Sequence, residues 1–215
     1  SGSKDLTISI SATTGSHAPI IIASAGAGQG SKRIIIKNVN ITAGHNGNTT
    51  SGIFIGASAI NTAGYDNDSI IINNVHIRKA YYGVYSYGNS ATNPNKRVYI
   101  TNSTIGADNT TNYITQRGVY LYYTKNSKVN NNHIYNITTS STSIYTPQGI
   151  YLYYSDTATV MNNIIHSVKY TGTGGYGAHG IEANYSDNVL IANNIIYDMQ
   201  GDGYTNITNS SMAGI

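Results

Sequence analysis

Apolar and polar residues alternate in short segments along the whole chain. The clearest are "RIIIKNVNI" from Arg33, "SIIINNVHI" from Ser69, "RVYITNSTI" from Arg97 and "TVMNNII" from Thr159. Val, Ile and Tyr dominate these segments, which favours β-strands. No window carries the sustained apolar stripe of an amphipathic helix. The pattern therefore predicts an all-β protein.

Two landmarks recur along the chain. The segment "GVYLYY" begins at Gly118, "GIYLYY" begins at Gly149, and the related starts are Gly52, Gly83, Gly180 and Gly214. The second landmark is an asparagine, present as Asn38, Asn74, Asn102, Asn131, Asn162 and Asn193. Successive glycines are 31 to 35 residues apart and successive asparagines 28 to 36. Because the two landmarks keep step, the chain is predicted to repeat one structural unit.

Each unit is predicted to contain three short strands: one from the glycine, one leading into the asparagine and one following it. Stacking such units at about 4.8 Å would pair each backbone group with the units above and below. This arrangement is a parallel β-solenoid, in which each coil contacts only its neighbours. Asn tolerates the left-handed backbone of a sharp turn, and stacked amides can hydrogen-bond to one another. The six asparagines are therefore predicted to form a structural ladder, to which a second row in the next position adds Asn132, Asn163 and Asn194.

The repeat "GIxL" followed by "V/I-x-N-N-x-I" resembles that of right-handed parallel β-helix proteins, the pectin-lyase-like group. The resemblance runs from about Ile34 to Ile215 and implies a right-handed parallel β-helix of about seven coils with three short strands each. Residues 1–30 are interpreted as a degenerate first coil and residues 31–215 as regular repeats of a single segment, 1–215. The group includes polysaccharide lyases, glycoside hydrolases, epimerases, phage tailspikes and non-catalytic surface proteins, so the fold does not select a function.

The composition indicates a setting outside the cell. The chain has no Cys and no Trp, one Phe and 20 Tyr, and 10% charged residues. This favours a secreted or cell-surface bacterial protein whose signal sequence is not in this segment. No apolar run is long enough to insert into a membrane, and a net charge of +3 does not favour nucleic acid as a partner. Because the chain starts without Met and stops inside a repeat, further coils or domains are expected beyond both ends.

The tyrosines are predicted to form an exposed face. Within "GVYLYY", Val119 and Leu121 should point inward and Tyr120 and Tyr122 outward. Stacked coils then align two outward rows with a further tyrosine at the strand end, and the predicted carbohydrate-binding residues are Phe54, Tyr85, Tyr87, Tyr120, Tyr122, Tyr151, Tyr153 and Tyr185. Ring faces suit the C–H faces of sugars, and phenol hydroxyls can bond sugar hydroxyls. The alternative is that stacked tyrosines only stabilise the sheet.

A second hypothesis concerns catalysis beside this face. Arg117 and His179 precede glycine landmarks, and Glu182, the one Glu in the chain, lies in the row of Tyr151. These four side chains should converge. A lyase acting on a uronate needs a cation to neutralise the carboxylate and a base to remove a proton. Arg117 would supply the first, His179 or Tyr151 the second, and Glu182 would orient the base or hold a sugar hydroxyl. The alternative is a polar rim around a binding face.

Metal-binding residues are scarce. Asp156 and Asp187 should stack in the turn after the tyrosines, one coil beyond Lys125, which suggests either a calcium site or a surface ion pair. His76 and His133 share an outward row but should lie two coils apart, too far for one zinc ion. No cofactor is expected apart from this calcium candidate.

Three function classes remain open. The first is a polysaccharide-binding segment without catalysis, which the scarcity of acids favours because hydrolysis needs two opposed carboxylates. The second is a polysaccharide lyase. The third is a structural or adhesive solenoid of a surface or filament protein, in which the tyrosine face contacts another protein surface.

Overall fold

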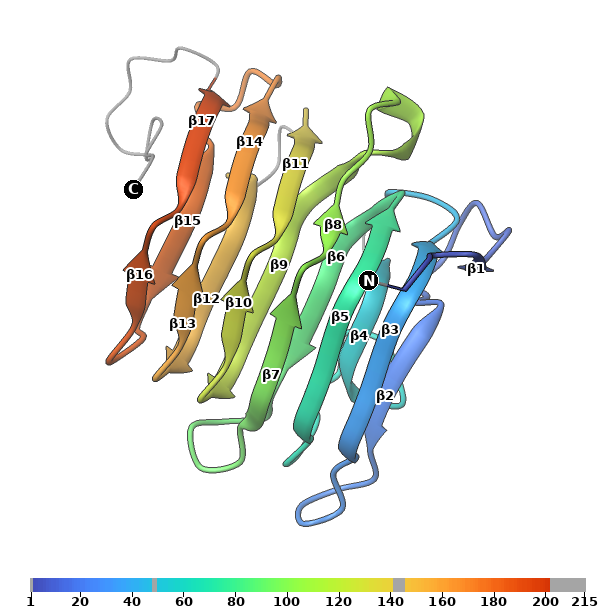
Figure 1. The fold of residues 1–215 in the computed structure, drawn as a ribbon, viewed down its shortest axis with the longest axis vertical. Helices are drawn as coiled ribbons and strands as arrows, with labels where there is room; N and C mark the ends of the chain where they lie inside the picture. The colour runs from blue at the N-terminus through green and yellow to red at the C-terminus, as the bar shows by residue number, and fades with distance from the viewer. Residues whose placement is uncertain (1, 48–49, 141–145, 202–215) are drawn as a thin grey trace.

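The structure, a computed structural model, describes residues 2–47, 50–140 and 146–201 (Figure 1). These residues form seventeen strands and one short 3-10 helix, η1 (Thr110–Asn112). The strands are β1 (Leu6–Ser9), β2 (Ile20–Ser24), β3 (Lys32–Thr42), β4 (Ser51–Ala57), β5 (Asp68–Arg78), β6 (Ala80–Tyr87), β7 (Asn95–Thr101), β8 (Thr104–Ile105), β9 (Ile114–Lys125), β10 (Lys128–Asn130), β11 (His133–Thr139), β12 (Gln148–Asp156), β13 (Thr159–Met161), β14 (Ile164–Tyr170), β15 (His179–Asn184), β16 (Leu190–Ala192) and β17 (Ile195–Gln200). None of the described residues belongs to a helix long and apolar enough to cross a membrane.

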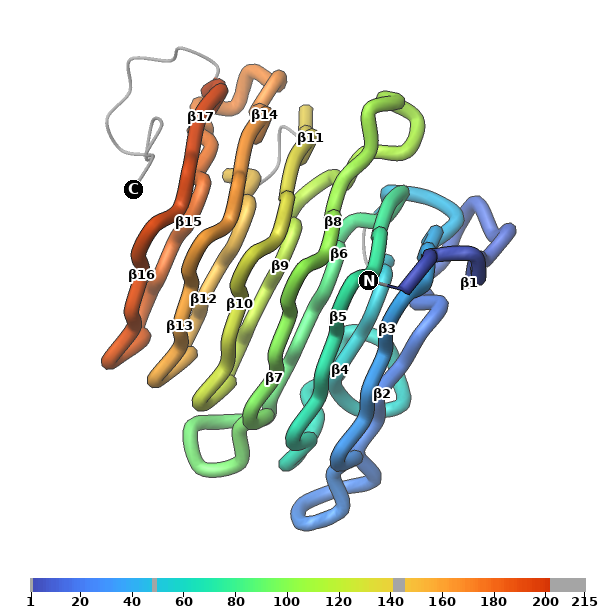
Figure 2. Tube along the Cα trace, viewed as in Figure 1, coloured from blue at the N-terminus to red at the C-terminus, as the bar shows by residue number. Residues whose placement is uncertain are grey.

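The strands stack as the coils of a parallel solenoid, and the Cα trace in Figure 2 shows the successive turns side by side. The glycine-bearing strands β4, β6, β9, β12 and β15 pair in this order, with β2 before β4, always in parallel. β5, β7, β10, β13 and β16 form a second stack, and β8, β11, β14 and β17 form a third. Six strands in the first stack give about six turns, close to the seven that the sequence predicts.

The first thirty residues join the same stacks. β1 pairs in parallel with the second half of β3, from Leu6 opposite Val39 to Ser9 opposite Thr42. β2 pairs with β4, from Ile20 opposite Ile53. In β3 and β5 the second and third strands of a coil run together as one strand that bends at the asparagine. The irregular N-terminal sequence therefore still follows the path of a coil.

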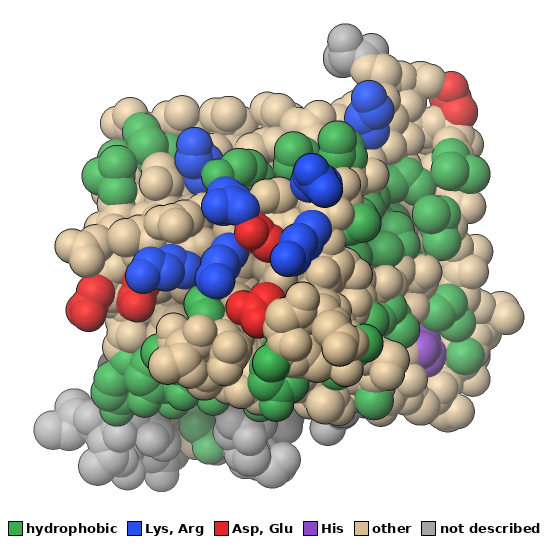
Figure 3. Space-filling model, turned by 90° about the horizontal axis from the view of Figure 1, so that it is seen from below, with side chains coloured by type: hydrophobic (Ala, Val, Ile, Leu, Met, Phe, Trp, Pro, Cys, Tyr) green, Lys and Arg blue, Asp and Glu red, His purple; other side chains and the backbone are tan. Residues whose placement is uncertain are grey.

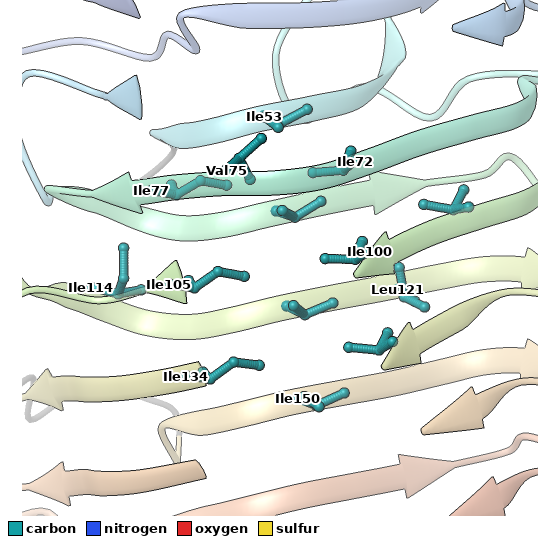
Figure 4. Close-up of a cluster of buried hydrophobic side chains, with 14 of the residues drawn as sticks. Ile53, Ile72, Val75, Ile77, Ile100, Ile105, Ile114, Leu121, Ile134 and Ile150 are labelled. Atoms are coloured by element: carbon teal, nitrogen blue, oxygen red, sulfur yellow. The ribbon is translucent and has the colours of Figure 1, made fainter. Parts of the chain in front are cut away.

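The predicted inward rows form the core, and Figure 4 shows their side chains between the strand stacks. Ile53, Val84, Val119 and Ile150 come from the glycine-bearing strands and are fully buried. They face a row from the third strands that contains Ile77, Ile105, Ile134 and Ile165, which are also fully buried. Burying such a side chain contributes about 1.5–3 kcal/mol, so these rows supply most of the stabilisation of each coil.

The glycine landmarks are required by close packing against this core. A Cβ added to Gly149 would lie 2.5 Å from Cγ2 of Ile165 and 2.6 Å from the carbonyl oxygen of Gly180. The same two contacts recur one coil earlier, where a Cβ on Gly118 would lie 2.5 Å from Ile134 and 2.6 Å from Gly149. The glycine column and the isoleucine column are thus complementary surfaces, and a side chain at the glycine would not fit between them.

The asparagine landmarks occupy the sharp turn that the sequence predicts. Each has a left-handed backbone, with φ between 51° and 59°, at Asn38, Asn74, Asn102, Asn131, Asn162 and Asn193. Asn adopts this conformation more readily than other residues with a side chain. The prediction of an aligned turn column is confirmed.

The amide ladder is carried mainly by the second predicted row, one residue further on. Among the described residues the landmark column forms one amide–amide hydrogen bond, from Asn74 Nδ2 to Asn38 Oδ1 (2.9 Å). The continuous ladder is built by Asn132, Asn163 and Asn194, whose amides bond along the column at 3.0 and 2.9 Å. Their side chains also bond backbone groups of the neighbouring coils. The left-handed residue directs its own side chain away from the turn, and the next residue directs its amide inward.

Candidate functional site

The aromatic residues stack in columns on the outer side of the glycine-bearing strands. Strand register places Tyr120 opposite Tyr85 and Tyr151, and Glu182 opposite Tyr151. We call Phe54, Tyr85, Tyr120 and Tyr151 the buried aromatic row; successive ring centroids are 5.5, 4.7 and 5.1 Å apart. The predicted alignment of the rows is confirmed.

Two further columns lie beside it. We call Tyr87, Tyr122, Tyr153 and Tyr123, Tyr154, Tyr185 the open tyrosine rows; their ring centroids are 4.8 to 4.9 Å apart along each column. Two adjacent residues of a regular strand point to opposite faces. Here Tyr123 has φ of 47°, and its equivalents one and two coils later have 49° and 50°, so both members of the pair "YY" point outward.

The expectation that the whole face is exposed is wrong for the buried aromatic row. Phe54, Tyr85, Tyr120 and Tyr151 are 0 to 9% exposed, because neighbouring rings cover them. The open tyrosine rows are half-buried, except Tyr185, which is 71% exposed. The surface available to a ligand is therefore the open tyrosine rows, and the buried aromatic row supports them from beneath.

The stacking also decides which part of each ring a ligand can contact. Tyr85 and Tyr120 are almost parallel, with an interplanar angle of 1°, and Tyr123 and Tyr154 differ by 16°. Parallel rings less than 5 Å apart cover each other's faces. Where the rings are parallel the solvent therefore meets ring edges and hydroxyls, whereas Tyr122 and Tyr153 are tilted by 44° and Tyr185 at the column end is exposed, so face-on stacking of sugars is limited to such positions.

The four predicted catalytic residues do converge. Arg117 Nε donates to Gln148 Oε1 (2.8 Å), and Gln148 Nε2 donates to Glu182 Oε2 (2.8 Å). His179 Nδ1 lies 2.6 Å from the same Glu182 oxygen, and Asn184 Nδ2 donates to the other oxygen (2.7 Å). Asn184 was not among the predicted residues; its position two residues after Glu182 on the same outward face could have identified it.

The aromatic columns hold the cationic end of this network. The Arg117 guanidinium carbon lies 4.4 Å from the ring centroid of Tyr120 and 4.8 Å from that of Tyr151. Arg117 Nη1 donates to the hydroxyl of Tyr82 (3.4 Å), and Tyr151 accepts a hydrogen bond from Asn184 (3.3 Å). Such cation–π contacts are most favourable when desolvated, and Arg117 is only 9% exposed.

The network is closed to substrate in this arrangement. His179 is 7% exposed; its Nδ1 contacts Glu182, and its Nε2 is buried without a hydrogen-bond partner among the described residues. Burial opposes ionisation of Glu182, but hydrogen bonds from His179, Gln148 and Asn184 outweigh it and hold the pKa of Glu182 below its usual value. Burial raises the pKa of Tyr151, so less of its hydroxyl is ionised and able to accept a proton from a substrate. The four residues therefore meet as a buried hydrogen-bonded cluster, in which His179 Nε2 is left unpaired among the described residues, rather than around an open reaction centre.

Asp156 and Asp187, the calcium candidates, are hydrogen-bonded to each other across the turn. Asp156 Oδ1 accepts a hydrogen bond from the backbone N–H of Asp187 (3.1 Å). The part of the chain that the structure describes contains no group of three or more His, Asp or Glu side chains arranged to hold a metal ion. His76 Nε2 lies 3.0 Å from the carbonyl oxygen of Gly106, so His76 is tied to the backbone rather than solvated.

A basic surface, which sequence reasoning missed, lies at the turn where β3, β7 and β10 begin (Figure 3). We call it the basic turn; its members are Lys32, Arg33, Lys96, Arg97, Lys125 and Lys128. Lys96 lies opposite Lys125, and ion pairs join Lys96 to Asp66 and Arg97 to Asp68. Asp156 lies opposite Lys125 one coil further on, with Asp187 beside it, so the six cations exceed the carboxylates at this turn by two and the turn is moderately positive. These Lys and Arg residues are far apart in the sequence. Their position in one patch can be recognised only when the register of the coils is known.

The fold and the site define a parallel β-solenoid with stacked aromatic columns on one outer face. The chain belongs to the family described as "Right handed beta helix region", whose family model matches residues 22–214. The handedness and the fold class predicted from the repeat are thereby confirmed. No curated protein matches the chain.

One solved structure with a similar fold is the Azotobacter vinelandii mannuronan C-5 epimerase AlgE6 A-module. It is 16% identical, and the match covers 86% of this chain and 68% of that chain with a TM-score of 0.30. A similarity of this size carries no information about substrate or mechanism.

Proposed function

We propose that this segment binds polysaccharide along the open tyrosine rows and carries out no catalysis. The observation that carries the proposal is the alignment of six outward tyrosines, in two neighbouring columns, at the spacing of the coils. Each tyrosine offers an apolar ring edge and a hydroxyl that can donate and accept. A polymer with hydroxyl groups at regular intervals would meet the same chemistry at each coil.

The rigidity of the columns favours binding. Tyr122 contacts Tyr87, Tyr120, Tyr123 and Tyr153 at ring-centroid distances of 4.7 to 5.8 Å. Its side chain is therefore already ordered before a ligand arrives. Immobilising a flexible side chain costs about 0.5–1.5 kcal/mol on binding, and a pre-stacked tyrosine avoids most of this cost.

The ligand would run along the solenoid axis, and at the carboxyl end of these strands it would approach the basic turn. Tyr123 and Lys125 are two residues apart on β9. An acidic polysaccharide would gain affinity from attraction to the basic turn, and a neutral polysaccharide would not. We also propose that the protein works where such polymers occur, in the extracellular space or at a bacterial cell surface.

The test is a glycan array probed with the purified chain, with neutral and acidic glycans as separate arms, and product analysis of every glycan that binds. Tyr122→Ser and Tyr153→Ser should each reduce affinity at least about tenfold, since aromatic residues at a binding surface often dominate its energy. Tyr99→Ser, on β7 in a different strand stack, is the matched control and should bind like wild type. Tyr122→Phe keeps the ring and removes the hydroxyl, so it measures the contribution of the hydroxyl to affinity.

Three outcomes would contradict the proposal. Binding that is equal in Tyr122→Ser and wild type would remove the tyrosine rows as the site. Release of unsaturated sugars that His179→Ala abolishes would establish a lyase instead. Failure to bind any glycan, together with a protein partner whose binding the Tyr→Ser variants abolish, would make the rows a protein interface.

A further inference from the structure

Two histidines from neighbouring coils meet on the outer side of the third strand stack, away from the tyrosine rows. His133 begins β11 and His166 lies in β14, which runs beside it in Figure 1. The register places Tyr135 opposite His166, so the two histidines are diagonal neighbours. Their Nε2 atoms are 2.8 Å apart.

The rings are held in place from several sides. Tyr135 stacks on His133 at 4.4 Å and on His166 at 5.2 Å between ring centroids. Tyr197, from β17, stacks on the other side of His166 at 4.7 Å with an interplanar angle of 11°. Both histidines remain partly exposed. The pair is therefore pre-oriented and still open to a small ion.

Hydrogen bonds fix the tautomer of His166. The hydroxyl of Ser167 donates to Asp198 Oδ2 (2.7 Å), so its one proton is in use. Ser167 Oγ also lies 3.0 Å from His166 Nδ1, where it must then act as acceptor. His166 Nδ1 consequently carries the proton, and in the neutral ring the lone pair is on Nε2. A histidine whose other nitrogen donates to such a relay is typical of a metal ligand.

The distance between the two Nε2 atoms matches ligands at a right angle around a metal ion better than ligands at the tetrahedral angle. Imidazole nitrogens bind divalent metals at about 2.0–2.1 Å. Two ligands at a right angle are then about 2.8–3.0 Å apart, and two at the tetrahedral angle about 3.3–3.4 Å. The separation of 2.8 Å fits adjacent corners of a square. Square-planar or tetragonal sites with N and O ligands favour Cu²⁺ or Ni²⁺.

We propose that His133 and His166 bind Cu²⁺, or Ni²⁺ in its absence, through their Nε2 atoms, with water in the remaining positions. On binding, the neutral His133 ring moves its proton from Nε2 to Nδ1, so both lone pairs face the metal and no net proton is released. The pair supplies two protein ligands, and the described residues place no third His, Asp or Glu with them.

The electrostatic surroundings support a neutral pair. Burial lowers the pKa of His133, and burial together with His133 lowers that of His166, while Asp108 raises both. Asp198 raises and Lys169 lowers the pKa of His166, and these two residues form an ion pair at 3.0 Å. The net shift of the pKa is downward for both rings.

The chain contains a matched control. His17 and His45 also bring their rings together, with centroids 4.8 Å apart. Their Nε2 atoms, however, lie 2.6 and 2.9 Å from the carbonyl oxygens of Ala43 and Gly15. That pair therefore cannot present two free Nε2 lone pairs to one ion.

The experiment titrates the purified chain with Cu²⁺ and Ni²⁺ at neutral pH, with calorimetry for affinity and electron paramagnetic resonance for the copper ligands. We expect one tetragonal copper site with two nitrogen ligands. His133→Gln and His166→Gln should each weaken it at least about tenfold, Ser167→Ala should weaken it less, and His45→Ala should leave it unchanged. Circular dichroism verifies that each variant is folded, and paramagnetic broadening in wild type tests the ligands without substitution.

Several results would overturn the site. The first is copper affinity in wild type no higher than in the double variant of His133 and His166. The second is a loss of copper affinity in His45→Ala as large as the loss in His133→Gln or His166→Gln. The third is paramagnetic broadening that leaves both histidine rings unaffected. Any of these would leave a simple imidazole–imidazole hydrogen bond between the two coils.

Discussion

Replacing Gly149 by alanine tests the packing that sets the repeat. The new Cβ would lie 2.5 Å from Cγ2 of Ile165 and 2.6 Å from the carbonyl oxygen of Gly180. Both distances are far below ordinary van der Waals contact, and the carbonyl belongs to β15, which is paired in parallel with β12. Neither neighbour can move without disturbing a coil. The substitution should therefore be destabilising although it adds a single methyl group.

The expected size follows from two opposing terms. Overpacking a well-packed core costs about 1–3 kcal/mol, and the two close contacts place this site near about 3 kcal/mol. Replacing Gly by Ala also reduces the entropy of the unfolded chain, which returns about 0.4–1 kcal/mol. The net destabilisation is about 2 kcal/mol, which lowers the Tm of a chain of this length by about 4–8 °C.

Urea unfolding followed by circular dichroism and tyrosine fluorescence measures this change. Gly47→Ala is the control, because Gly47 is exposed and, among the described residues, the new methyl would meet the ring of His45, a side chain that can shift; its effect should stay within about 0.5 kcal/mol. Combining Gly149→Ala with Ile165→Leu removes the branched methyl and should recover part of the loss. It should not recover all of it, since the contact with Gly180 remains. Unchanged stability of Gly149→Ala would refute the argument.

Three further predictions concern the ladder and the titrating groups. Asn163→Ala should cost about 2 kcal/mol or more in urea unfolding because it leaves buried backbone groups unpaired, whereas Asn162→Gly should change little because φ of 57° suits glycine. Because hydrogen bonds lower the folded-state pKa of Glu182, wild type should lose stability as the pH falls below about 4.5, and Glu182→Gln should lose less; parallel pH profiles would contradict this. Burial and neighbouring tyrosines raise the pKa of Tyr122 to about 12, so its ultraviolet titration step should appear near that pH and be missing in Tyr122→Phe.

The sequence predicted the features that depend on the repeat itself. Gly149 and Asn162 stand at fixed spacings, and each spacing reports a local requirement: no room for a Cβ at one, a left-handed backbone at the other. The alternation around Val119 likewise gave the inward row. Such requirements recur in each coil, and repetition makes them visible in a single sequence.

Features that depend on contacts between coils were harder to predict. Alternation assigns Tyr120 to the outer face but does not show that the rings above and below cover it. The sequence offers two adjacent asparagine rows, and the structure shows that the row of Asn163 rather than that of Asn162 carries the continuous ladder. His133 and His166 meet along a diagonal, two residues and one coil apart, and only the full register reveals that contact.

The difference between repeated and single features also separates the two proposed ligands. In a solenoid each coil contacts only its neighbours, so a column such as Tyr122 and Tyr153 presents the same group at each step along the axis. Only a ligand with a repeating structure, such as a polymer, can contact the equivalent group on every coil. The contact between His133 and His166 occurs between one pair of coils and presents two nitrogens at one point. A single metal ion can bind both nitrogens at that site. Binding of copper there and binding of polysaccharide at the tyrosine rows should therefore be independent of each other.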